Sequence, residues 1–253
     1  MIRRKSLVTG VFLITAILAV TACGKKDKKE NTDTATESTE ITSEVVPIDM
    51  TKSYSRGRVD GQTYTNKFFN YSCTFDDEWR LYNDEEIDEI NSFQAGAATD
   101  ENVALVLEEN YLLDMAAARY DGKGSISIMV GTISSGAFSE RDYAESGLNA
   151  AAESMKQAGY TDVKAEIGTV SFCGRERVSI NISAIAPPDS SASDATKTGT
   201  DEESDTTEAA DDGVEGSVVY EKQITAVNGR YISVLSFKAD SEEAVNKIIA
   251  MFK

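Results

Sequence analysis

Alternating apolar and polar residues recur along the sequence from about residue 62 and predict β-strands. In residues 176–186 the apolar side chains occupy every second position, which is the period of a strand with one buried face. Alternating or β-type apolar runs predict further strands at 62–66, 69–75, 112–120, 125–133, 162–171, 217–227 and 230–238. Asn228-Gly229 separates the last two strands and is a strong hairpin signal.

A helical period of apolar residues appears in the segments between these strands. The clearest helix, at 139–158, opens on Ser139, has Asp142 three residues later and closes at Gly159, so both of its ends carry capping signals. Further helices are predicted at 83–94, 101–110 and 241–252, the last capped by Asp240. The order of elements predicts an α+β fold around a mainly antiparallel sheet, with Trp79 as a core anchor.

Two stretches are too polar to bury a core. Residues 23–56 are mostly Thr, Ser, Glu, Asp and Lys, and residues 187–216 begin with Pro187-Pro188 and carry ten acidic residues against Lys197 alone. The sequence therefore predicts a disordered stalk at 23–56 and a single α+β domain at 57–253. Within that domain, residues 187–216 are predicted to form a disordered insertion, which a hairpin tolerates.

The first residues have the pattern of a secretory signal. Arg3, Arg4 and Lys5 precede an apolar run at 7–20, and small residues follow in Val20-Thr21-Ala22-Cys23. This end resembles the lipobox of bacterial lipoproteins. The resemblance implies removal of residues 1–22 and acylation of Cys23, with fatty acyl chains such as palmitate holding the protein on the extracytoplasmic side of the cell membrane. An uncleaved anchor helix is the alternative, although the apolar run is short for a membrane span.

Charge and composition narrow the classes of function. The formal net charge is −18, which disfavours nucleic acid as a partner. There is no histidine, so Ser-His-Asp and Cys-His catalysis and histidine zinc sites are excluded. Carboxylate chemistry remains, and the acidic runs that could supply it are Asp76, Asp77 and Glu78, and Asp84, Glu85 and Glu86. Because such runs usually face water, we expect no enzyme, cofactor or catalytic residue.

A calcium site in the acidic insertion is a further hypothesis for the acidic residues. Its candidate ligands are Asp201, Glu202, Glu203, Asp211 and Asp212. These residues do not have the fixed offsets of a twelve-residue calcium loop, so the sequence predicts solvated acidic chain and no metal site.

Two cysteines remain besides Cys23. Cys73 alternates in phase with buried aromatic residues and is predicted to be a core strand residue, whereas Cys173 lies in a predicted turn with Gly174. In an exported protein the pair Cys73 and Cys173 could form a disulfide or remain as two thiols, and the sequence leaves both open.

Several aromatic and turn patterns recur in a known family. These are the run 70–79 that ends at Trp79, Tyr143 near the start of the long helix, and the closing strand and helix at 231–252. In these features the chain is similar to PsbP-like lipoproteins, whose plant members are photosystem accessory proteins. The resemblance implies an α/β/α sandwich around an antiparallel sheet, and no functional residue of the family matches a position here.

The sequence thus favours a membrane-anchored, extracytoplasmic lipoprotein that acts as a non-catalytic binding or accessory module. A protein partner is compatible with this hypothesis, but its identity is not encoded in any motif. The alternative is a solute-binding receptor associated with a transporter. Such receptors usually show repeated βαβ units, which the predicted elements lack.

Overall fold

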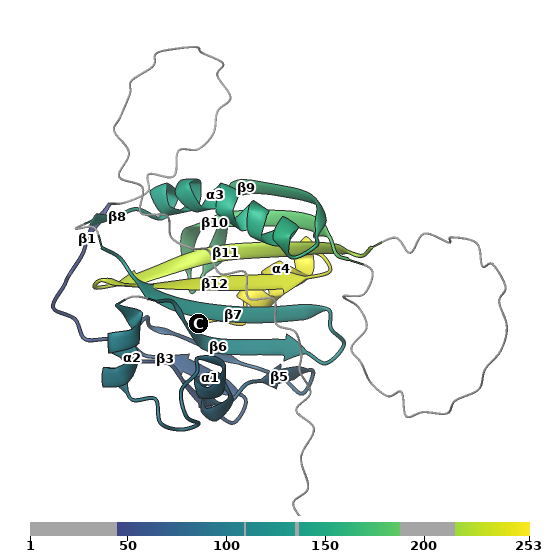
Figure 1. The fold of residues 1–253 in the computed structure, drawn as a ribbon. Helices are drawn as coiled ribbons and strands as arrows, with labels where there is room; N and C mark the ends of the chain where they lie inside the picture. The colour runs from purple at the N-terminus through teal and green to yellow at the C-terminus, as the bar shows by residue number, and fades with distance from the viewer. Residues whose placement is uncertain (1–44, 109, 135–136, 188–215) are drawn as a thin grey trace, which may run out of the picture.

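The computed structural model describes residues 45–108, 110–134, 137–187 and 216–253. Its centre is a seven-stranded sheet in the order β5-β6-β7-β12-β11-β10-β9 (Figure 1). The strands are β5 (Trp79–Leu81), β6 (Leu112–Arg119), β7 (Gly124–Thr132), β9 (Thr161–Phe172), β10 (Arg175–Ile185), β11 (Val218–Asn228) and β12 (Tyr231–Ala239). Every neighbouring pair in this sheet is antiparallel, which confirms the predicted α+β class and its mainly antiparallel sheet.

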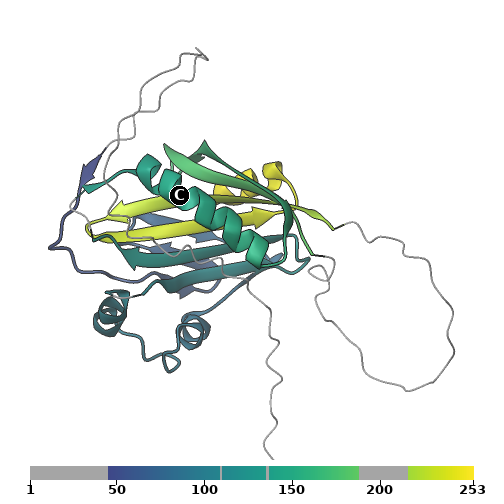
Figure 2. The same cartoon turned by 45° about the horizontal axis from the view of Figure 1, so that its top comes forward.

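The two faces of the sheet are covered differently. Helix α3 (Glu140–Gln157) lies across one face, where Ala151 and Met155 pack on the apolar residues of β10 (Figure 2). Helix α4 (Glu242–Ile249) covers the opposite face and buries Val245 and Ile249 against β11 and β12. This arrangement gives the expected layers, with helices on both sides of a central sheet.

The strands predicted at 62–66 and 69–75 form a second sheet of their own. It has the order β2 (Arg58–Asp60), β3 (Thr63–Asn66) and β4 (Tyr71–Thr74), and it packs beside α4. The backbone of Ser72 exchanges hydrogen bonds with that of Lys253, 2.9 and 3.0 Å long, so the end of the chain extends this small sheet. Trp79 is buried in the same core, as predicted.

Two short helices lie at the β6 end of the main sheet. Helix α1 (Asp84–Ile90) contacts β6 and α2 (Asp100–Leu107) contacts β7. Asn83 and Thr99 each cap a helix, and each forms a reciprocal capping box with the third helical residue. The last helix is capped by Ser241, whose hydroxyl accepts from the Ala244 N–H at 3.2 Å, and not by Asp240 as predicted.

The predicted start of the domain at residue 57 is too late. Residues 45–57, which we call the strap, run along the molecule and contain β1 (Val46–Pro47), which pairs with β8 (Ala137–Phe138). Tyr54 is buried, and its ring centroid lies 5.4 Å from that of Phe68 and 5.2 Å from that of Tyr231. The last part of the predicted stalk, residues 45–56, therefore belongs to the fold. The physical reason is that aromatic and polar partners distant in sequence surround it.

Other predictions fall outside the described residues. These are the signal at 1–22, Cys23, the stalk up to residue 44 and nearly all of the acidic insertion, with its candidate calcium ligands. The described ends of the insertion are consistent with the predicted hairpin, because Ile185 lies opposite Val218 in the β10–β11 pair and the Ala186 N–H donates to Ser217 O at 2.9 Å. Nowhere in the described ranges is there a helix with both the length and the apolar character to span a membrane.

Candidate functional site

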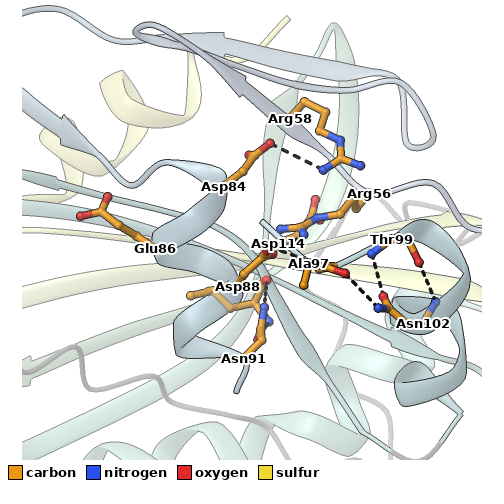
Figure 3. Close-up of polar contacts among 12 residues, drawn as sticks. Arg56, Arg58, Asp84, Glu86, Asp88, Asn91, Ala97, Thr99, Asn102 and Asp114 are labelled. Carbon is orange, nitrogen blue, oxygen red and sulfur yellow. Dashed lines mark hydrogen bonds and ion pairs between the residues drawn. The ribbon is translucent and has the colours of Figure 1, made fainter. Parts of the chain in front are cut away.

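Three of the five charged residues that are buried in the described ranges lie where the strap meets β6 and α1; the other two, Glu221 and Lys222, are neighbours in β11. Asp114, Asp88 and Arg56 are all buried there and converge from three separate elements (Figure 3). Buried charges require compensation by partners, so the contacts of these residues decide whether the site is structural or is open for chemistry.

Asp114 is placed by an irregularity in its own strand. The β6–β7 register shifts between Leu113 and Met115, so Asp114 is the extra residue of a β-bulge. A bulge bends the strand and re-aims a side chain that regular pairing would hold on the sheet face. Here it allows the carboxylate to meet the strap and the small sheet.

The Asp114 carboxylate accepts hydrogen bonds from four groups of the chain. The Tyr54 hydroxyl donates to Oδ1 at 2.9 Å, the Asn66 Nδ2 donates to Oδ2 at 2.8 Å, and the Tyr64 hydroxyl also donates to Oδ2. The Gly57 N–H lies 3.2 Å from both carboxylate oxygens. We call these five residues the Asp114 cluster. Its carboxylate is saturated by donors of the protein itself.

The glycine in this cluster is required by close approach. A Cβ built at Gly57 would lie 2.4 Å from side-chain atoms of Tyr64, closer than any side chain tolerates. Only glycine lets the strap backbone come near enough to the Tyr64 ring for its N–H to reach Asp114.

The two phenols are kept protonated. Burial raises the pKa of Tyr54 and Tyr64 well above the usual value, and the negative charge of Asp114 raises the pKa of both further. A protonated hydroxyl is what a donor to a carboxylate needs. Both tyrosines therefore act as hydrogen-bond donors to Asp114.

A buried ion pair lies beside the cluster. The Arg56 guanidinium donates to the Asp88 carboxylate of α1, and the two side chains are only 3% and 2% exposed. Burial alone would lower the pKa of Arg56. The hydrogen bond to Asp88 and the negative charge of Asp88 outweigh the effect of burial, so the pKa of Arg56 is raised. Asp88 also accepts from the Ala98 N–H at 3.3 Å, so the pair joins the strap, α1 and the loop before α2.

The space beside these groups is small. A cavity of about 10 Å³ is lined by Tyr54, Arg56, Asn91, Leu107 and Asp114 among others, which is room for roughly one water molecule. A second cavity of the same size lies under the start of α3, beside Tyr143 and Gln223. Neither could enclose a metabolite.

The acidic runs singled out in the sequence lie elsewhere and have local roles. Asp76, Asp77 and Glu78 are exposed; Asp76 accepts from the Glu78 N–H at 3.0 Å, and Glu78 pairs with Arg119 at 2.9 Å. In the second run, Asp84 accepts from the Val59 N–H at 3.1 Å and Glu86 belongs to the capping box of α1. Four of the six carboxylates thus have structural roles: Asp76 in a turn, Glu78 in an ion pair, Asp84 in a hydrogen bond to β2 and Glu86 in a helix cap.

Sequence reasoning missed the carboxylates that are buried. The available signal was a single Asp114 inside the apolar run 112–118, where a charged residue requires a partner. No group of three or more Asp, Glu or Cys within the described ranges is arranged to hold a metal ion.

Cys73 and Cys173 are both free thiols in the structure and belong to or border the same hydrophobic cluster. Cys73 is buried in β4, as predicted. Cys173 is half-buried in the β9–β10 turn, where Cys173 and Gly174 have φ values of 48° and 73°. Positive φ at both central residues is typical of a type I′ hairpin turn. A disulfide between the two under oxidising conditions stays one of the two alternatives that the sequence leaves open.

The different surroundings of the two thiols predict different rates of alkylation. Burial, and then the neighbouring Cys173, raise the pKa of Cys73 to about 12, which leaves little thiolate at neutral pH. In a Cys23→Ala variant, iodoacetamide should therefore modify Cys173 faster than Cys73 in the folded protein, and both at similar rates in urea, as followed by peptide mass spectrometry. Faster labelling of Cys73 in the folded state would contradict its buried position, and a protein two hydrogens lighter with no reactive thiol would reveal the disulfide.

Comparisons with known proteins give a structural likeness. No protein-family model matches the sequence, and no characterised protein matches it either. The described fold is similar to the solution structure of cyanobacterial PsbP (CyanoP) from Synechocystis sp. PCC 6803, at 9% sequence identity and a TM-score of 0.41. The match covers 76% of this chain and 91% of that one.

Proposed function

We propose that this protein is a lipoprotein, anchored through lipid on Cys23 at the extracytoplasmic side of the cell membrane, whose folded domain is a non-catalytic binding or accessory module. The observation that carries the proposal is the sequence at residues 3–23, with its basic start, apolar run and lipobox-like end. Acyl chains on one cysteine supply the two hydrophobic signals that stable anchoring takes.

The firm attachment of the strap to the folded domain also supports this proposal. Residues 54–57 are fastened to the body of the domain by the Asp114 cluster and by the Arg56–Asp88 pair. Only residues 24–44 separate the acylation site from the described fold. A domain attached through its N-terminal side benefits from a firmly fixed first segment, because any pull on the anchor acts there first.

The two buried carboxylates beside the strap support a binding module more than an enzyme. Asp114 and Asp88 have their oxygens occupied by donors of the chain, and the cavity beside them admits about one water molecule. Contact with a partner would then use the outer surface of the domain. A solute receptor would instead need an enclosed space of roughly 300 Å³ or more for a metabolite-sized ligand.

Replacing Cys23 by Ala tests the anchor. We expect the variant to lose incorporation of a fatty-acid label and to move from the membrane fraction to the soluble extracytoplasmic fraction, because the thiol is the acylation site. Cys173→Ala is the matched control and should be labelled and retained like the wild type. A Cys23→Ala protein that remains in the membrane with residues 1–22 uncleaved would show a helical anchor in place of the lipid.

A further inference from the structure

Among the residues that the structure describes, strand β9 is an edge of the main sheet and pairs on one side only, with β10. Its twelve residues form a long row with one free side, and Asp162, Lys164 and Glu166 are exposed on it. An open edge of this length is a template for pairing with another strand. The other edge strand, β5, has only three residues.

The turn geometry shows which backbone groups point outward. Phe172 lies opposite Arg175 across the two-residue turn, and the residues that flank such a turn form a hydrogen-bonded pair. Alternation along the strand then directs the backbone groups of Glu166 and Gly168 toward β10. The N–H and C=O groups of Ala165, Ile167 and Thr169 point away from the sheet.

The charges on this edge complement one another. Lys164 and Glu166 are on the same face of β9, and neither has an ion-pair partner among the described residues. In an antiparallel pair of two β9 strands centred on Ala165, Lys164 of each copy lies opposite Glu166 of the other, and Val163 lies opposite Ile167. Opposite charges facing each other across strands are stabilising.

Other registers fit less well. Moving the centre to residue 164 or 166 would still pair the outward backbone groups, but it would set Lys164 or Glu166 directly opposite its own copy, and like charges in that position are destabilising. Centring on Ile167 would set Lys164 opposite Val170 and leave both charges unpaired. Centring on Val163 would confine pairing to the first residues of the strand, where the β9–β10 register is irregular and Asp162 has a φ of 48°.

We propose that two copies of this protein associate through β9, antiparallel about a two-fold axis at Ala165, so that their seven-stranded sheets become continuous. The contact is isologous, because each copy contributes the same Lys164, Ala165 and Glu166. The partner that this surface fits is a second copy of the chain.

Cysteine cross-linking of the full-length protein in membranes tests the axis. Opposite residues in a hydrogen-bonded antiparallel pair have Cα atoms about 5.5 Å apart, within the range of a disulfide. Ala165→Cys should therefore give a disulfide-linked dimer under mild oxidation with copper phenanthroline. Thr169→Cys is the control: its Cα would be about 27 Å from its counterpart, so it should not cross-link. Equal cross-linking of the two variants, or none, would overturn the proposal.

Charge exchange on the Ala165→Cys background tests the register. Lys164→Glu or Glu166→Lys alone places like charges opposite each other twice per dimer, and we expect the cross-linking rate to fall by about tenfold. The double exchange restores opposite charges and should restore the rate. A double variant as slow as the single ones, or a cross-linked product whose mass shows a different protein, would also overturn the proposed pairing.

Discussion

Replacing Asp114 by Ala is expected to lower the free energy of unfolding by about 3–5 kcal/mol, the range for breaking a buried charged network. The substitution removes the acceptor of Tyr54, Tyr64, Asn66 and the Gly57 N–H, and it leaves these donors buried without partners. Urea denaturation followed by Trp79 fluorescence measures the change, since Trp79 is buried in the folded protein.

A matched control is Asp121→Ala. Asp121 accepts from Arg119 at 3.0 Å and from the Lys123 N–H at 2.9 Å, but it is exposed, so its loss should cost less than about 1 kcal/mol. If Asp114→Ala were no more destabilising than Asp121→Ala, the Asp114 cluster would have no stabilising role.

Replacing Arg56 by Met is expected to cost a similar amount, about 3–5 kcal/mol, because it leaves Asp88 charged, buried and without its cation. The double substitution Arg56→Met with Asp88→Leu should recover much of the loss, since a buried ion pair can be replaced by apolar side chains of similar volume. Urea unfolding of the single and double variants, analysed as a double-mutant cycle, gives the coupling between the two residues.

Arg58 is the natural control for Arg56. It lies two residues along the chain, its side chain is 53% exposed, and its nearest carboxylate oxygens, on Asp84 and Asp100, are 3.6 and 3.7 Å away. Arg58→Met should therefore change stability by less than about 1 kcal/mol. Equal losses for Arg56→Met and Arg58→Met would contradict the view that burial makes the Arg56–Asp88 pair important.

Patterns among neighbouring residues were sufficient to predict most of the helices and strands. The helix from Ser139, the alternation in β10 and the hairpin of β11 and β12 each depend on neighbouring residues, and the structure confirms all three. The turn of this hairpin lies one residue later than predicted, because Asn228 pairs with Tyr231 and Gly229 and Arg230 form the turn. The separate small sheet could not be predicted in this way. The β3 and β4 strands have the same alternation as the others, and their separation from the main sheet depends on packing with α4 and on the hydrogen bonds of Ser72 to Lys253.

The strap shows that composition alone does not decide whether a segment is ordered. Half of residues 45–56 are polar, so this short segment has too few apolar residues to form a core of its own. Their order comes from partners distant in sequence: Asp88 lies 32 positions from Arg56, Asp114 lies 60 positions from Tyr54, and Phe138 and Tyr231 are farther still. The candidate site was missed because its residues are also distant in sequence. Clustered exposed carboxylates form a visible pattern in a sequence, whereas Asp114 is one isolated acidic residue in an apolar strand.

Amide hydrogen exchange of the intact protein, read at residues 54–57, tests most directly whether the strap is part of the fold. We expect the N–H groups of Arg56 and Gly57, which donate to Asp100 and Asp114, to be protected to an extent comparable with β3. In Asp114→Ala the protection of Gly57 should fall more than that of β12. Exchange of residues 54–57 in the wild type at the rate of an unstructured peptide would contradict the account and return the start of the domain to residue 57.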